Sequence, residues 1–167
     1  AYLARSIRAN YSQAASEAVL KYALIIVLNT TAIIVLSLLA SFFTGTTGQT
    51  LFVIGAFAFL KFFTGGIHLN SSTACTLASA VMIIMIVHAP FQYEQGGIWL
   101  MFASMILFYF FAPSGQIRKG TLPERYIPYL KWGAIALCMI NLLFWQSSLL
   151  SLIITVQACT LTPIAFK

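Results

Sequence analysis

The sequence predicts an all-α, polytopic membrane protein with about six transmembrane helices and an amphipathic interfacial helix at its N-terminal end. Of its 167 residues, 60% are hydrophobic and only 7% are charged, and the mean hydropathy is +0.94. Because a typical soluble domain has about 25% charged residues, this chain has too few charges to cover a surface that faces water. Its composition also excludes disorder, which requires low hydrophobicity and high charge.

The first 20 residues predict an amphipathic helix on the inner leaflet. Apolar residues recur at helical spacing, whereas polar and charged residues, including Arg5, Arg8 and Glu17, occupy the other positions. Such a helix places its apolar face in the lipid interface and its cations near anionic head groups. The simpler alternative is a membrane anchor with no part in chemistry.

Six apolar stretches follow, each close to the roughly 20 residues that a membrane-crossing helix needs. Clusters of glycine, threonine and proline separate them, and the long connection after the fourth stretch runs from Pro113 to Pro128. Residues 1–167 are therefore expected to form one membrane domain, with a six-span bundle over 22–165. The predicted spans are 22–43, 48–63, 73–89, 97–112, 129–145 and 148–165.

The basic residues predict the orientation of these spans. If the N-terminus is cytoplasmic, all nine Lys and Arg residues fall on the cytoplasmic side, in agreement with the positive-inside rule. With an odd number of spans, the basic residues would no longer all lie on the cytoplasmic side. We therefore expect six spans and both termini in the cytoplasm. The nine residues are Arg5, Arg8, Lys21, Lys61, Arg118, Lys119, Arg125, Lys131 and Lys167.

Cys75 is the strongest candidate nucleophile, because it lies at the predicted start of the third span. Ser71 and Ser72 are both suitable N-caps for this helix. With Ser72 as the cap, Cys75 is the third helical residue, where unpaired N–H groups and the helix dipole favour a thiolate. Cys138 and Cys159 lie within the fifth and sixth spans and are expected to be ordinary buried residues.

His68 is the candidate general base for this cysteine. In one straight helix, His68 and Cys75 would stand about 10 Å apart along the axis, too far for direct proton transfer. A bend at Gly65 and Gly66 would fold His68 toward Cys75, where it could take the thiol proton and later protonate a leaving amine. The alternative is a loop histidine at the level of the head groups beside an ordinary helix residue.

Other kinds of site have little support in the sequence. Its two histidines and three cysteines form neither a CxxC nor an HxxxH pair, so no zinc ligand set is evident. The predicted topology places Glu94 on the outside and the other two acids on the inside. We expect no metal, no cofactor and no nucleic-acid partner.

The segment Leu60–His68, with Cys75 seven positions later, resembles the signature of the accessory gene regulator B family. These are bacterial integral-membrane cysteine endopeptidases that process quorum-sensing pro-peptides. A second similarity is Phe111–Pro113, which leads into a polar basic loop. Lys61 stands where the family usually has arginine, which keeps the charge but loses the bidentate fork.

The resemblance implies that Cys75 is the nucleophile and His68 its general base and acid, on the cytoplasmic side of a bacterial cell membrane. The implied substrate is a pro-peptide with an amphipathic helix, a signal segment containing Cys or Ser, and an acidic tail. Cys75 would cleave at the tail and hold the signal segment as a thioester. An internal thiol or hydroxyl would then close a thiolactone or lactone. The resemblance also suggests a homodimer.

Basic residues on the cytoplasmic side are candidates for contact with the acidic tail, since charge steers association and adds specificity. Control of topology alone is the other explanation for them. For the glycine pair, a simple turn that ends a helix is the plainer explanation, and it is compatible with a role in positioning His68. The candidate substrate-binding residues are Lys61, Gly65, Gly66, Arg118, Lys119, Arg125 and Lys131.

Two other functions remain open at this point. One is a small membrane peptide exporter without protease activity, and the other is a structural or receptor-like membrane subunit. An ion-coupled transporter needs polar or ionisable residues along its spans. The spans here offer little beyond Asn29, Asn141, Gln157 and scattered serines and threonines, which argues against this kind of transporter.

Overall fold

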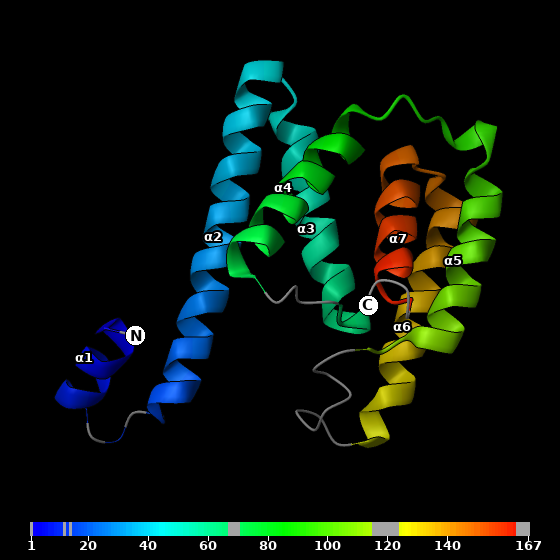
Figure 1. Ribbon diagram of the computed structural model, residues 1–167. Helices are drawn as coiled ribbons and strands as arrows, with labels where there is room; N and C mark the ends of the chain where they lie inside the picture. Colours follow the sequence, from blue (N-terminus) through cyan, green and yellow to red (C-terminus); the bar gives the residue numbers. More distant parts are fainter. Residues whose placement is uncertain (1, 12, 14, 67–70, 115–123, 163–167) are drawn as a thin grey trace.

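The computed structural model describes residues 2–11, 13, 15–66, 71–114 and 124–162 (Figure 1). The regular elements in these ranges are all helical, which confirms the predicted all-α class. They are α1 (Tyr2–Asn10), α2 (Glu17–Thr44), α3 (Thr47–Thr64), α4 (Ser72–His88), η1 (Tyr93–Gln95), α5 (Gly97–Phe111), η3 (Glu124–Tyr126), α6 (Ile127–Ile140), the π-helical turn η4 (Asn141–Trp145) and α7 (Ser148–Thr160).

Each predicted span overlaps a helix, but the helices differ in length. The sixth span, predicted over 148–165, corresponds to α7, which ends at Thr160, and residues 163–165 lie outside the described residues. Three are long and apolar enough to cross a membrane, namely Glu17–Thr44, Thr47–Thr64 and Ile127–Trp145. The helices α4, α5 and α7 are apolar but have only 17, 15 and 13 residues. The structure thus supports a membrane protein with three spans by length and composition, and the count of six spans stays a prediction.

The prediction of one helix over residues 1–20 is wrong in its extent. The structure has two helices here, because Ser16 caps the start of α2 with its Oγ, which accepts the N–H of Val19 at 3.4 Å. The short α1 is a separate helix, and an ion pair between Arg5 Nε and Glu17 Oε1, 2.9 Å apart, joins it to α2.

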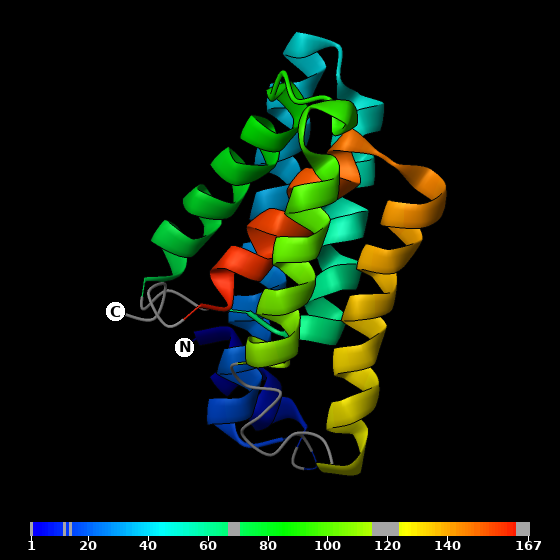
Figure 2. The same cartoon turned by 90° about the vertical axis from the view of Figure 1, so that its right-hand side faces the viewer.

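The remaining helices form one bundle. The long α2 packs along α4 and α3, while α7 packs between α3 and α5. Figure 2 shows α5 in front of α7, with α4 to its left and α6 to its right. The core that these helices share contains fully buried apolar side chains from α3, α5 and α7, including Val53, Met101, Phe108 and Ile153.

A buried amide closes the turn between α6 and α7. Asn141 is fully buried, and its Nδ2 donates to Ser151 Oγ at 2.9 Å. Its Oδ1 accepts the N–H of Ser147 at 3.0 Å, and its backbone carbonyl accepts the N–H of Gln146 at 2.7 Å. Through its side chain and its backbone, Asn141 thereby satisfies polar groups at the end of the π-helical turn and the start of α7.

The basic residues that the structure describes lie at one end of the bundle, which we call the basic end. Successive helices alternate in direction, so the start of α2, the end of α3 and the start of α6 lie at this end (Figure 1). This distribution agrees with the predicted sorting of charge, while the side of the membrane stays a prediction. The described basic residues are Arg5, Arg8, Lys21, Lys61, Arg125 and Lys131.

Candidate active site

Cys75 lies in the first turn of α4, but one position later than predicted. Ser71, not Ser72, is the N-cap, and its Oγ accepts the N–H of Ala74 at 3.4 Å. Cys75 is therefore the fourth helical residue, and its N–H donates to the Ser71 carbonyl at 3.0 Å. The hydroxyl of Ser72 is free for another contact, and it donates to Asn29 Oδ1 of α2 at 2.7 Å.

The Ser72–Asn29 hydrogen bond fixes the start of α4 against α2, and we expect it to contribute measurably to stability. Ser72→Ala should lower the free energy of unfolding in detergent micelles by about 0.5–1.5 kcal/mol. In a double-mutant cycle, Asn29→Ala should cost little more once Ser72 has been replaced. Strictly additive losses would show that this hydrogen bond does not couple the two helices.

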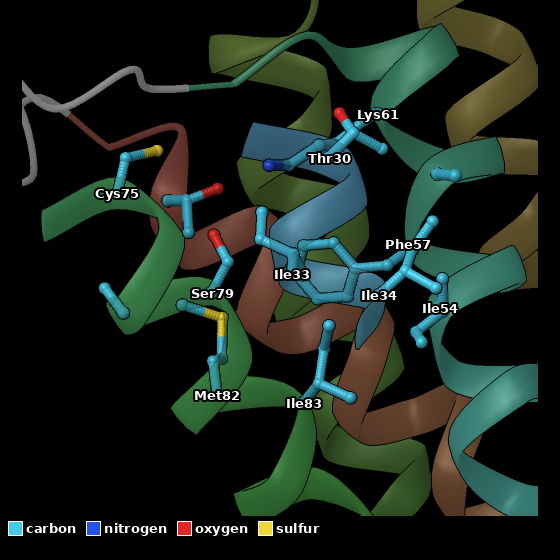
Figure 3. A pocket seen from close by; sticks show the side chains of 13 residues that line it. Thr30, Ile33, Ile34, Ile54, Phe57, Lys61, Cys75, Ser79, Met82 and Ile83 are labelled. Carbon is cyan, nitrogen blue, oxygen red and sulfur yellow. The ribbon is translucent and has the colours of Figure 1, made fainter. Parts of the chain in front are cut away.

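Cys75 is half-buried and lines a cavity of about 290 Å³ between α2, α3, α4 and α7. Five of the lining residues have polar or thiol side chains, namely Thr30, Lys61, Cys75, Ser79 and Thr160. Figure 3 shows Cys75, Lys61 and Thr30 at one end of this Cys75 cavity, which we call its mouth. The far wall is formed mainly by Ile33, Ile34, Ile54, Phe57, Met82 and Ile83.

Lys61 shares this cavity with Cys75, although the two residues lie on different helices. Its Nζ lies 5.6 Å from the centroid of the Phe57 ring, a favourable cation–π arrangement that holds the ammonium at the mouth. In Figure 3 the Lys61 nitrogen extends from α3 toward the side on which Cys75 lies. The structure thus brings a predicted substrate contact and the predicted nucleophile to one site.

The chain leaves α3 through Gly65, whose φ of 72° and ψ of −148° lie in a region that favours glycine. Its N–H donates to the Lys61 carbonyl at 2.9 Å and so ends the helix. Gly66 is different, because a Cβ there would lie 3.5 Å from Gln157 Nε2, an ordinary van der Waals distance. Only the first glycine of the pair is required by the backbone.

A buried glutamine from α7 holds this turn. Gln157 Nε2 donates to Thr64 Oγ1 at 2.8 Å and to the Gly65 carbonyl at 2.7 Å. The Gln157 Oε1 is buried and has no hydrogen-bond partner within the described part of the chain. Sequence reasoning treated Gln157 only as a polar residue within a span, since nothing in the sequence links it to a glycine 92 positions earlier.

A third segment completes the turn. The N–H of Ser114 donates to the Thr64 carbonyl at 2.9 Å, and Gly65 and Ser114 form an isolated parallel bridge. Ser114 directly follows Phe111–Pro113, so the two segments that carry the family resemblance lie side by side. We call the cluster of Thr64, Gly65, Ser114 and Gln157 the Gly65 junction.

Comparison with known proteins identifies the family. The family model described as Accessory gene regulator B matches residues 1–164 of this chain. The chain belongs to the accessory gene regulator B family. An AgrB-like protein of Halalkalibacterium halodurans is 28% identical over 169 residues, which cover 99% of this chain and 86% of the relative. No solved structure matches the chain.

Membership of the accessory gene regulator B family confirms the predicted resemblance and places the chain in the processing of quorum-sensing peptides. It agrees with the apolar helices in indicating a membrane protein. Within the described residues, no group of three His, Cys, Asp or Glu side chains is placed to hold a metal ion.

The other basic candidates of this accessory gene regulator B chain lie away from the Cys75 cavity, on α6 and just before it. The Arg125 guanidinium stacks over the ring of Tyr126 at 4.9 Å, and Lys131 Nζ lies 5.2 Å from the Tyr109 ring. Both are at the basic end. The candidates that lie outside the described residues are His68, Arg118 and Lys119.

The free cysteines outside the cavity differ from each other. Cys138 is buried in α6, as predicted, whereas Cys159 is exposed, so the prediction that it is buried is wrong. Cys159 lies near the end of α7, and its side chain is exposed in the part of the chain that the structure describes. This exposed thiol is a useful internal reference for the reactivity of Cys75.

The amide side chains of Asn29, Asn141 and Gln157 all form hydrogen bonds between elements. Asn29 links α2 to Ser72 of α4, Asn141 links η4 to α7, and Gln157 links α7 to the end of α3. These groups are therefore used for packing rather than presented along a polar path through the bundle.

Proposed function

We propose that this chain is an integral-membrane cysteine endopeptidase that removes the C-terminal tail of a quorum-sensing pro-peptide and promotes its cyclisation. The observation that carries this proposal is the position of Cys75. It lies in the first turn of α4, at the polar mouth of an otherwise apolar cavity, together with the Lys61 ammonium. Family membership supplies the class of substrate, a peptide of the quorum-sensing system.

The first half of the reaction is acyl transfer to the enzyme. The Cys75 thiolate attacks the carbonyl carbon at the junction of signal and tail, and a C–S bond forms. The C–N bond then breaks, and the tail leaves as an amine that takes the proton which His68 removed from the thiol. Cys75 now carries the signal segment as a thioester.

The second half releases the product without any further reactant. An internal thiol or hydroxyl of the peptide attacks the thioester carbonyl, the bond to Cys75 Sγ breaks, and the proton of the attacking group returns to the Cys75 thiol. Water competes with this ring closure. The apolar wall of the Cys75 cavity supports cyclisation because it keeps water from the acyl-enzyme.

Positive charge at the basic end provides attraction for an acidic tail. Lys61 lies in the cavity itself, and Arg125 and Lys131 lie near the start of α6. Such charges mainly raise the rate of encounter and the specificity, and the effect falls with salt. A cytoplasmic site and a homodimer belong to the same proposal.

A peptide exporter without protease activity is the competing hypothesis. It requires a polar path across the bundle, whereas Asn29, Asn141 and Gln157 are engaged in contacts between elements. An exporter would also have no need of a thiol at the mouth of the cavity. The protease is therefore the hypothesis that the site supports better.

Co-expression with a pro-peptide tests the proposal. The substrate for this test is a pro-peptide with an amphipathic helix, a Cys or Ser segment and an acidic tail, as the family resemblance implies. We expect the wild-type chain and Cys159→Ala to release the tail. Cys75→Ala should abolish cleavage, and His68→Ala should reduce it by about 100-fold or more, the usual contribution of a general base.

The variants must be compared at equal abundance in the membrane, with tail release and the cyclic product measured by mass spectrometry. Cleavage by Cys75→Ala at the wild-type rate would refute the nucleophile. Transport of an intact peptide into liposomes by Cys75→Ala, without cleavage by the wild type, would establish the exporter instead.

A further inference from the structure

We infer that the Cys75 cavity is a specificity pocket, which binds the apolar side chain of the peptide residue that becomes bonded to Cys75. This residue lies immediately N-terminal to the cleaved bond. The inference rests on the proposed function and deepens it, because it names the part of the substrate that the cavity selects and the chemical class of side chain that fits.

The cavity changes character along its length. The residues of its mouth, Thr30, Lys61 and Cys75, come from three helices, whereas its other end is lined by branched aliphatic, aromatic and thioether side chains. On α4, the residues Cys75, Ser79, Met82 and Ile83 follow helical spacing along one face. The pocket therefore runs inward from the sulfur for about 12 Å, the rise of eight helical residues.

The size of the cavity favours a side chain over a helix. Its volume of about 290 Å³ lies at the lower limit of ligand pockets, which measure about 300–1,000 Å³. A peptide helix is about 10–12 Å wide with its side chains, so the amphipathic helix of a pro-peptide does not fit. One large apolar side chain does fit, with its backbone at the polar mouth.

The position of Cys75 determines which peptide residue, N-terminal or C-terminal to the cleaved bond, places its side chain in the cavity. In the acyl-enzyme, the carbonyl of the retained residue is bonded to Cys75 Sγ, so the side chain of that residue is only two bonds from the carbonyl carbon. The cavity begins at this sulfur and leads away from the mouth. The tail leaves after the first step, and the pocket therefore selects the retained residue.

The test uses Cys75 alkylation by peptide-like probes and needs no natural substrate. The probes are acetyl-alanine, acetyl-leucine and acetyl-phenylalanine chloromethyl ketones, whose side chain lies beside the carbonyl as in the retained residue. Thiolate attack forms a C–S bond and expels chloride. Alkylation rates of Cys75 and of the exposed Cys159 are measured on the full chain in detergent micelles by site-resolved mass spectrometry.

We expect Cys75 to react at least about tenfold faster with the phenylalanine probe than with the alanine probe, the selectivity typical of an apolar pocket. The reference Cys159 should show no such preference. Ser79→Leu fills the pocket and should reduce the ratio of the two rates at Cys75 to about one. Met82→Ala enlarges the pocket and should shift the preference to a naphthylalanine probe.

Met85→Ala is the matched control for Met82→Ala. It removes the same side chain from the same helix at a position that is 68% exposed and does not line the cavity. The control should keep the wild-type ratio of rates at Cys75.

Several outcomes would overturn the inference. One is that Cys75 reacts with all the chloromethyl ketone probes at the same rate, while its reaction with iodoacetamide shows that the thiol is accessible. Another is a phenylalanine preference that Ser79→Leu leaves unchanged. A preference that appears only after phospholipid is removed, and disappears when it is added back, would assign the cavity to a lipid acyl chain. None of these results affects cleavage by Cys75, whereas loss of the proposed function would appear as cleavage by Cys75→Ala.

Discussion

Gly65→Ala is expected to reduce pro-peptide processing by at least about tenfold, whereas Gly66→Ala is expected to retain it. Gly65 has a φ of 72° and a ψ of −148°, a conformation that costs a residue with a side chain about 1–3 kcal/mol. Each 1.4 kcal/mol corresponds to about a tenfold change in an equilibrium. Because Gly65 leads from α3 toward the segment that carries His68, this strain acts on the candidate active site.

Gly66→Ala is a stringent control, because it adds the same methyl group at the next residue. The new Cβ would lie 3.5 Å from Gln157 Nε2 and 3.8 Å from Lys61 Cε, both ordinary contacts. Processing of the co-expressed pro-peptide and the melting temperature in detergent should be measured for both variants. Equal activity of the two would show that the conformation of Gly65 does not matter for function.

Replacement of Gln157 should have a comparably large effect. Gln157→Leu removes both donors that the Gly65 junction receives from α7 and leaves Thr64 Oγ1 and the Gly65 carbonyl without these hydrogen bonds. Each of the two lost hydrogen bonds contributes about 0.5–1.5 kcal/mol, so together they contribute about 1–3 kcal/mol. We expect the free energy of unfolding to fall by that amount and processing to fall by about tenfold or more.

Gln157→Glu tests the hydrogen bonds of Gln157 independently of the size and shape of its side chain. It keeps the size but replaces the donating amide nitrogen by an oxygen, and it places an acid in a fully buried position. Its processing should therefore be as poor as that of Gln157→Leu. Cys159→Ala, two positions away on the exposed face of α7, should behave as the wild type. Normal processing by Gln157→Glu would show that the junction does not depend on the amide.

The helices could be predicted from the sequence because each apolar stretch ends in clear local signals. The turn at Gly45, with a φ of 69°, and the cap at Ser147 fall between stretches that hydropathy alone had separated. The first helix was harder. Its apolar spacing continues without a break into the next helix, and only the Ser16 cap separates the two.

The candidate site could be predicted only in its local parts. Cys75 was placed at a helix start from its neighbours, but the choice between Ser71 and Ser72 as the cap needed the backbone geometry. The meeting of Lys61 with Cys75 depends on how α3 packs beside α4 and α2. The contact of Gln157 with Gly65 spans 92 positions, and no periodicity or spacing encodes a hydrogen bond over such a separation.

The unequal helix lengths have a consequence for the lipid around the protein. With 13 residues, α7 is about 20 Å long, whereas the hydrocarbon layer of a typical bilayer is about 30 Å thick. The long α2 exceeds that thickness with its 28 residues. A bilayer that surrounds both helices must thin beside one and thicken beside the other, or the helices must tilt. If α7 crosses the bilayer, as the sequence predicts, this hydrophobic mismatch is greatest there. Because its last residue, Thr160, also lines the Cys75 cavity, we would then expect acyl-chain length to affect the surroundings of Cys75.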